Sequence, residues 1–229
     1  MPPAPARRQP DRPADIWFRR EATLGLVQDV QRQAIPELTR VFGHGGLYLR
    51  PSHAVPDTLS GNMLANVLSL HRQGGAFAGD LACQDRALPV ASGCLSLVYA
   101  LFVLETSPDP AALLAESARV LKPDGVALIL SLNPWVPGHL RWAFQGLRAL
   151  DASTVAMRVR EAGLDVQRRH TLGPVWSSPQ GLDLATRRSD PLARLRMASL
   201  TVARRRDPGL TPLRSVSPAM KFRPGVSAG

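Results

Sequence analysis

Two apolar runs with one amphipathic helix between them constrain the fold of this chain more than any other feature. The runs are CLSLVYALFVL at residues 94–104 and VALILSL at residues 126–132. Unbroken runs of this length are typical of strands buried on both faces of a sheet. Residues 109–121 between them have helical apolar spacing, with Asp109 placed to cap the helix and Pro110 at its first position. This order predicts a parallel α/β sheet, which binds ligands at the carboxyl ends of its central strands.

Further elements extend the pattern on both sides. Residues 16–43 carry a helical apolar stripe that Pro36 interrupts, so we expect two helices or one kinked helix, with Gly43 as the stop. The other predicted strands are 46–50, 66–71, 76–83, 165–172 and 197–205, and the other predicted helices are 137–149 and 151–162. Strands and helices therefore alternate through the middle of the chain.

The net charge of +10 lies at the two ends of the chain. Residues 1–20 hold five Arg and two acidic residues, and residues 187–229 hold ten basic and two acidic residues. The 13 basic and 14 acidic residues between these segments nearly cancel. We expect residues 1–15 and 207–229 to be disordered basic arms. Such arms are either solvated tails or weak binders of nucleic acid or another anionic partner, and no aromatic residues interleave with the Arg to stack on bases.

Cysteine content and hydropathy limit the class of protein. Cys83 and Cys94 are too few for a disulfide framework or a metal site, and each is expected to fill space as a small apolar residue. No apolar stretch reaches the roughly 18 residues of a membrane span, and the first residues lack a signal-peptide core. We therefore expect a cytoplasmic protein with no membrane span.

Residues 88–135 resemble class I S-adenosylmethionine-dependent methyltransferases, in the small-molecule, methyltransferase type 11-like branch. The motifs that carry the resemblance are Leu88-Pro89, Val103-Leu104-Glu105, Pro108-Asp109-Pro110 and the run from Arg119 to Gly125, RVLKPDG. The resemblance implies a Rossmann-like three-layer α/β sandwich with a mostly parallel seven-stranded sheet and an antiparallel last strand. It places the methyltransferase-like domain at residues 44–206, after an N-terminal helical segment at 16–43.

The chain departs from the family pattern at the positions that bind the cofactor. The family's first strand leads into a Gly-x-Gly-x-Gly loop, but Pro51, Ser52 and His53 follow the strand here, and the GHGG run at residues 43–46 is expected to precede it. The fifteen residues 51–65 hardly leave room for a crossover helix. The second predicted strand ends in His71-Arg72 instead of the ribose-binding acid. The position of the family's adenine-edge Asp is Gln84, with Asp85 next to it.

The resemblance nevertheless implies candidate site residues. Those expected to contact the cofactor are Arg50, Ser52, His53, Cys83, Gln84, Ala100, Leu101 and Phe102, and those expected to line a substrate pocket are Asn133 and Trp135. Core packing is the alternative for several of them. His139 and His170 are candidate general bases or surface histidines, and Asp80 is expected within the third strand in a hydrogen-bonding or catalytic role. Methyl transfer depends mainly on proximity and orientation, so no catalytic residue is assigned.

Two functions from different classes follow. The first is an S-adenosylmethionine-dependent methyltransferase acting on a small-molecule or macromolecular acceptor that the sequence does not identify. The alternative is a catalytically inactive, methyltransferase-like interaction module that has lost cofactor binding. An enzyme predicts an open pocket at the strand ends near residues 50, 71, 84 and 101. An inactive module predicts that Arg50, His53, Arg72 or Phe102 fills that space.

Overall fold

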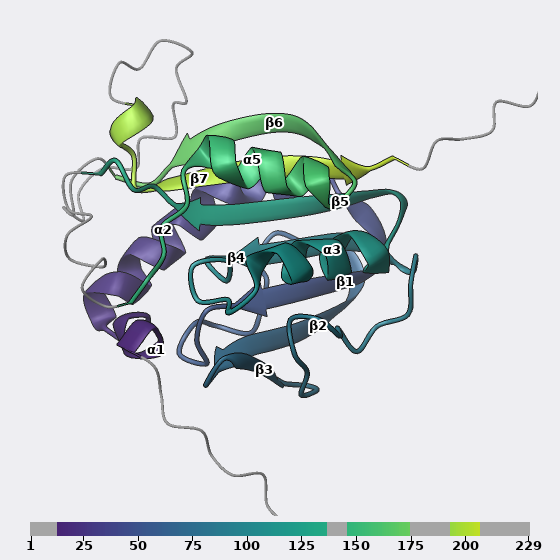
Figure 1. Ribbon diagram of the computed structural model, residues 1–229, viewed down its shortest axis with the longest axis horizontal. Helices are drawn as coiled ribbons and strands as arrows, with labels where there is room; N and C mark the ends of the chain where they lie inside the picture. The colour runs from purple at the N-terminus through teal and green to yellow at the C-terminus, as the bar shows by residue number, and fades with distance from the viewer. Residues whose placement is uncertain (1–12, 137–145, 175–192, 207–229) are drawn as a thin grey trace, which may run out of the picture.

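Seven strands form one mixed sheet in the computed structural model, which describes residues 13–136, 146–174 and 193–206 (Figure 1). The strands are β1 (Phe42–Arg50), β2 (Met63–Gln73), β3 (Ala76–Gly79), β4 (Leu95–Leu101), β5 (Leu121–Leu132), β6 (Leu164–Leu172) and β7 (Ala198–Arg205). Their order in the sheet is β3-β2-β1-β4-β5-β7-β6. Strands β2, β1, β4 and β5 are mutually parallel, and β7 runs antiparallel to both of its neighbours. The predicted class I methyltransferase-like sheet with a reversed final strand is confirmed.

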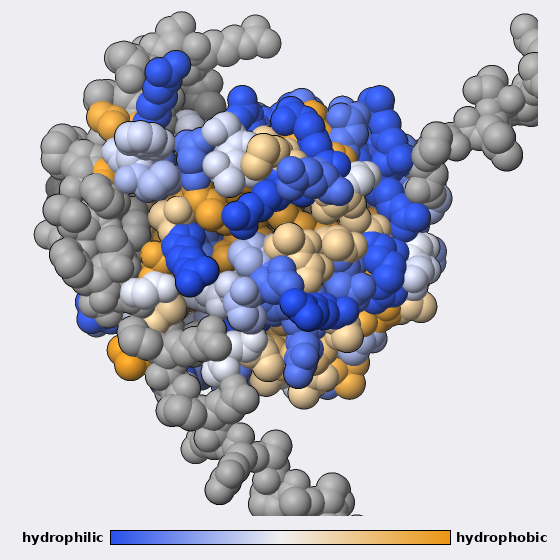
Figure 2. Space-filling view, in the orientation of Figure 1, coloured by the Kyte–Doolittle hydropathy of each residue, from blue (hydrophilic) through white to orange (hydrophobic). Residues whose placement is uncertain are grey.

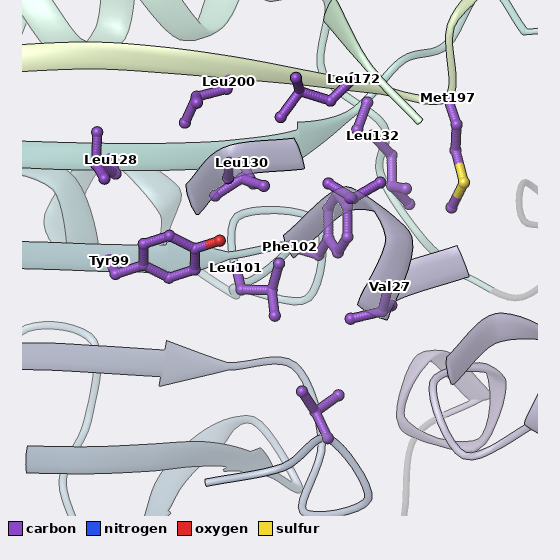
Figure 3. Packing of buried hydrophobic residues seen from close by; sticks show 14 of the residues in the cluster. Val27, Tyr99, Leu101, Phe102, Leu128, Leu130, Leu132, Leu172, Met197 and Leu200 are labelled. Carbon is purple, nitrogen blue, oxygen red and sulfur yellow. The ribbon is translucent and has the colours of Figure 1, made fainter. Parts of the chain in front are cut away.

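Helices cover both faces of this sheet and make three layers (Figure 1). One face packs against α1 (Pro13–Trp17) and α2 (Glu21–Leu38), and the other packs against α3 (Pro110–Val120) and α5 (Ala152–Glu161). Every residue of β4 is buried, because alternate side chains enter the two cores. Figure 3 shows the first core, in which side chains of β4, β5 and β7 lie together with Val27 of α2. Hydrophilic side chains cover much of the outer face of α3 and α5 (Figure 2).

The cap predicted for the central helix is present. The Asp109 side chain accepts a hydrogen bond from the Ala112 backbone N–H at 3.1 Å, and Pro110 is the first helical residue. Residues 123–125, within the RVLKPDG run, form a bulge inside β5, where Asp124 has a φ of 63°. A Cβ on Gly125 would lie 2.8 Å from the Lys122 carbonyl oxygen, so this close approach requires glycine.

The N-terminal helical segment breaks at a different place from the predicted one. The interruption lies at residues 18–20, between α1 and α2, whereas Pro36 lies inside the last turn of α2. The strand that follows also begins earlier than expected, at Phe42, so the GHGG run at 43–46 lies within β1 and does not precede it. A Cβ on Gly46 would meet Leu64 at 2.4 Å. Gly43 and Gly46 therefore leave room for the Ser96 and Leu64 side chains.

The first three strands lack the helices that usually connect parallel strands. Residues 51–62 join β1 to β2 with turns only, as the short connection predicted. Strand β3 is four residues long, shorter than the strand predicted at 76–83. It forms an antiparallel hairpin with β2 through Gly74 and Gly75, whereas the prediction reversed only the last strand of the sheet. The reversal follows from the two-residue turn, since a parallel neighbour needs a crossover of a dozen or more residues.

Several predicted segments fall wholly or partly outside the described residues. Most of the predicted helix 137–149 does, including His139, and residues 147–150 at its end are not helical. The arm predicted at 207–229 and residues 1–12 of the arm predicted at 1–15 also lie outside them, whereas residues 13–15 are helical and begin α1.

Candidate functional site

The carboxyl edge of the parallel strands is the place where this fold class binds ligands. We use this name for the edge at which β1, β2, β4 and β5 end, at Arg50, Gln73, Leu101 and Leu132. All four strands point the same way in Figure 1, and α1 lies beyond their ends. The edge therefore brings together the segments that carry most of the predicted site residues.

The end of β1 is closed by its own side chains. Arg50 is 6% exposed, and its guanidinium donates a hydrogen bond to the Val55 carbonyl oxygen. Ser52 is buried, and its hydroxyl accepts a hydrogen bond from the Ala54 N–H at 3.3 Å. His53 is exposed beside these two. The loop after β1 thus folds back onto the Arg50 side chain, at the position where the family carries its glycine-rich loop.

A second histidine lies next to this loop. The rings of His53 and His71 are 6.0 Å apart between centroids, at an angle of 67°. Burial lowers the pKa of His71, and the charges of Arg50 and His53 lower it further. His71 Nδ1 is buried and has no hydrogen-bond partner. At neutral pH this side of the edge therefore carries one guanidinium and a neutral imidazole.

A buried ion pair occupies the end of β2. The Arg72 guanidinium donates through both terminal nitrogens to the two carboxylate oxygens of Asp85, and both side chains are at most 3% exposed. The Ser107 hydroxyl donates to the same carboxylate, and the guanidinium carbon lies 3.9 Å from the centroid of the Phe77 ring. The Asp85 carboxylate, next to the family's adenine position, is thus committed to an internal contact.

Cys83 and Gln84 follow the β2–β3 hairpin. The backbone of Cys83 pairs with Phe77 in both directions, and burial raises the pKa of its thiol to about 11. A thiol with that pKa is protonated at neutral pH and is a poor nucleophile. Gln84 is exposed, so its amide is free to meet a ligand. Asp80 lies just after β3, not within it, and is exposed; its carboxylate accepts a hydrogen bond from the Ser69 N–H at 2.9 Å.

The end of β4 is packed with apolar side chains. Ala100 and Leu101 belong to the two cores and are at most 3% exposed. Phe102 is fully buried, with a φ of 47°, a left-handed conformation that a bulky residue rarely adopts. Its ring stacks on Phe18, which follows α1 (Figure 3 shows Phe102). The N-terminal segment therefore closes over the end of β4.

Glu105 is a buried acid that the sequence marked only as part of a family motif. Its Oε1 accepts a hydrogen bond from the Leu132 N–H at 2.6 Å, and Oε2 is buried with no partner. Burial raises the pKa of this carboxyl to about 8. Glu105 is thus largely protonated at pH 7 and connects the segment after β4 to the end of β5.

Asn133 and Trp135 lie together after β5. The Asn133 amide donates to the carbonyl oxygens of Arg194 and Arg196 at 2.7 and 2.8 Å, so this side chain fastens the segment before β7. Trp135 is 69% exposed, and its indole N–H donates to Asp151 at 3.1 Å. Of these two predicted pocket residues, only Trp135 presents a large open surface.

The structure thus separates the predicted site residues by exposure. His53, Gln84 and Trp135 are accessible, whereas Arg50, Phe102 and the remaining members are half-buried or buried in internal contacts. The roles of all ten as ligand contacts stay predictions. The Arg72–Asp85 pair was missed because its partners are thirteen residues apart. The sequence feature that could have revealed the pair is the basic Arg72 near the position of the family's ribose-binding acid, with Asp85 nearby in the chain.

A cavity of about 320 Å³ lies away from this edge, between α2 and the loop after β1. Its lining residues include Gln31, Arg32, Leu59 and Tyr99. Gln31 also donates a hydrogen bond to the Tyr48 hydroxyl at 2.6 Å, in the core between α2 and the sheet.

The described residues include no group of three or more His, Cys, Asp and Glu that could hold a metal ion. No helix among them is long and apolar enough to cross a membrane. His170, a candidate general base, lies on the outer strand β6 with Nε2 3.3 Å from Glu37.

The central segment is similar to known sequences. Residues 55–129 match a family described as a methyltransferase domain. The malonyl-[acyl-carrier protein] O-methyltransferase of Laribacter hongkongensis is 41% identical over 73 residues, which are 31% of this chain and 25% of the relative. The chain therefore matches about a quarter of the length of this curated relative.

Solved structures share the fold at low sequence identity. One chain of the Haloferax volcanii complex that contains the Trm112 methyltransferase activator has a TM-score of 0.56 at 17% identity, covering 86% of this chain and 99% of its own. A SAM-dependent methyltransferase of Thermotoga maritima has a TM-score of 0.53 at 10% identity, covering 84% of this chain and all of its own. The [4+2]-cyclase SpnF has 0.50 at 14% identity, covering 77% and 80%. These likenesses show the fold, and the same fold supports differently named reactions.

Proposed function

We propose that this chain, which carries a class I methyltransferase domain, transfers a methyl group from S-adenosylmethionine to an acceptor at the carboxyl edge. The observation that carries the proposal is the family match over residues 55–129, which runs from the loop after β1 into β5 on a sheet of the expected strand order. This segment contains the ends of β2 and β4, two of the four strand ends at the carboxyl edge.

The residues at the edge suit one end of the cofactor better than the other. The exposed Gln84 amide, with Cys83 beside it, would hold the adenine edge, and His53 is the exposed group nearest the end of β1. Bound there, the cofactor would supply an electrophilic methyl group. The ribose end fits poorly, because Arg72 stands where the family has an acid and already binds Asp85. We therefore derive no catalytic step through the cofactor.

We further propose that this chain has lost the family's glycine-rich loop. The segment after β1 is turned back by Arg50, and its one glycine up to β2, Gly61, lies against Ile35 of α2. Loss of one charged hydrogen bond to the ribose alone would weaken cofactor binding by roughly 1.5–3 kcal/mol, or about tenfold to more than a hundredfold.

A second function is favoured by the packing of the same edge. Arg50, Arg72 and Phe102 are each at most 6% exposed, and the inactive interaction module predicted that such side chains would fill the cofactor space. His53 does not fill it, because it is exposed. Under this alternative the sheet is kept as a scaffold for a partner and no cofactor binds.

The acceptor named for the curated relative is not assigned to this chain. That relative is named for methylating malonyl-[acyl-carrier protein], but the shared segment covers only a quarter of its length. We propose that the acceptor approaches beside Trp135, the most exposed large apolar side chain among the described residues, after the end of β5. Asn133 would position this segment through its two carbonyl contacts.

Calorimetric titration of the full chain with S-adenosylmethionine, and separately with S-adenosylhomocysteine, tests the proposal. We expect binding in the micromolar range, weakened by Gln84→Ala and unchanged by Met157→Ala on the outer surface of α5. The absence of both heat and thermal stabilisation at millimolar ligand would refute the methyltransferase proposal and leave the interaction module.

A further inference from the structure

A basic groove lies between the end of α2 and the outer strands of the sheet. Its volume is about 200 Å³. The residues lining it are Glu37, Arg40, Val41, Val126, Gln167, Arg168, Val202, Ala203 and Arg204. Three arginines from three separate segments thus surround a short apolar floor, on the face of the sheet that packs against α2.

Glu37 organises two of these arginines. Its Oε1 accepts from Arg40 at 2.7 Å and its Oε2 from Arg168 at 2.8 Å, while the Glu37 side chain is only 9% exposed. The Arg40 and Arg168 side chains remain 58% and 50% exposed, so each is held by one contact and keeps other N–H groups for a ligand. A buried acid that orients two exposed guanidiniums lowers the entropy lost when they bind an anion.

Arg204 adds the third charge on the opposite side. Its nearest acid, Asp124, is 3.9 Å away and 79% exposed, and a pair of that kind contributes little. The three guanidiniums against Glu37 leave the lining with a net charge of +2. Beyond the last described residue, Arg206, the sequence continues with Asp207 and then Arg214, Lys221 and Arg223. The groove is therefore contiguous in sequence with a basic tail.

We propose that this groove binds the phosphate backbone of a nucleic acid. Guanidinium forks match phosphate oxygens, and a hollow of this size admits one phosphate group with its ester oxygens. No aromatic side chain lines the groove, so bases do not stack there and binding does not depend on sequence. The site is in the folded domain and is independent of the methyl-transfer proposal, because it lies away from the carboxyl edge.

The test is fluorescence anisotropy of a labelled 20-nucleotide single-stranded RNA with the full chain, without S-adenosylmethionine, over a series of salt concentrations. The double variant Arg168→Gln/Arg204→Gln should bind about tenfold or more weakly and reduce the slope of log K against log salt by about 1.4, since each lost phosphate contact lowers it by about 0.7.

Arg86→Gln is the matched control, an exposed arginine paired with Asp109 at the start of α3. It should leave the affinity and the slope unchanged, and thermal unfolding should confirm that every variant is folded. The proposal is overturned if the groove double variant binds like the unchanged chain while truncation after Arg206 abolishes binding. It is also overturned if polyglutamate of equal charge competes as well as RNA, since the partner would then be an acidic protein.

Discussion

The rings of Phe18 and Phe102 stack with centroids 6.1 Å apart and planes within 19°, which fastens the N-terminal segment to the end of β4. Phe102 makes this contact from a left-handed backbone conformation, with a φ of 47°. Such a conformation costs a residue with a Cβ about 1–2 kcal/mol. The packing of a fully buried ring therefore outweighs local backbone strain at the carboxyl edge.

Phe102→Ala is expected to lower the free energy of unfolding by about 3–5 kcal/mol, because it removes a buried aromatic ring. Phe102→Gly should be at least as stable as Phe102→Ala, since glycine relieves the strain at positive φ. Phe77 is the matched control, as it is equally buried without a positive φ, and there glycine should be less stable than alanine by about 0.5–1 kcal/mol. Urea denaturation measures both differences. The same order of stability at the two positions would contradict the strain at Phe102.

Asp85→Asn is expected to lower the free energy of unfolding by about 3–5 kcal/mol, because it leaves the buried Arg72 guanidinium without its counter-charge. Replacing both partners, as Arg72→Met/Asp85→Leu, should cost less than Asp85→Asn alone, since no buried charge remains. A double-mutant cycle by chemical denaturation checks the coupling. Additive losses at the two positions would show that the pair is not coupled.

Glu105 predicts a pH dependence of stability in a defined direction. Its carboxyl pKa is about 8 in the folded chain against a normal value of 4.5, so the folded state binds the extra proton between these limits. The contribution of the protonated Glu105 carboxyl to the free energy of unfolding should be fully present below about pH 4.5. It should fall as the pH rises toward 8, by at most about 1.4 kcal/mol per pH unit. Glu105→Gln should remove this slope in thermal unfolding measured from pH 5 to 8.

Glu116 provides the control for that experiment. Its pKa is lowered, chiefly by the hydrogen bond from Arg119, so its contribution to stability is present above its normal pKa and is lost only as the pH falls into the acid range. Glu116→Gln should therefore leave the slope between pH 5 and 8 unchanged. An equal change of slope in both variants would mean that Glu105 is not the responsible group.

Substitution by alanine should change stability in opposite directions at two glycines. Gly125→Ala would bring a Cβ within 2.8 Å of the Lys122 carbonyl oxygen, so it should be destabilising by about 1–3 kcal/mol. Gly25 lies inside α2 with nothing within 4 Å of its Cβ position, so Gly25→Ala should be stabilising by about 0.5–1 kcal/mol. Differential scanning calorimetry of both variants checks the signs, and a stabilising Gly125→Ala would contradict the close backbone approach in the β5 bulge.

Strong local signals explain why the centre of the fold was predictable. The runs at 94–104 and 126–132 are apolar at the positions that pack into the two cores. Asp109 and Pro110 define the start of α3. The N-terminal break was misplaced because a proline within a helix ordinarily ends or kinks it, yet Pro36 falls in the last turn, near the end of α2 at Leu38. Strand β3 was predicted too long because Leu81, Ala82 and Cys83 are apolar, although the pairing with β2 ends at Gly79.

The sequence by itself determined the two buried strands at the centre of the sheet and the helix between them, because each depends on residues close together in the chain. Only the tertiary structure decided what occupies the carboxyl edge and where charge gathers. Arg72 forms an ion pair with Asp85, and the Phe102 ring stacks on Phe18. Arginines from three separate segments line one groove with Glu37. Such contacts depend on side-chain packing between distant segments, which no local pattern of residues encodes.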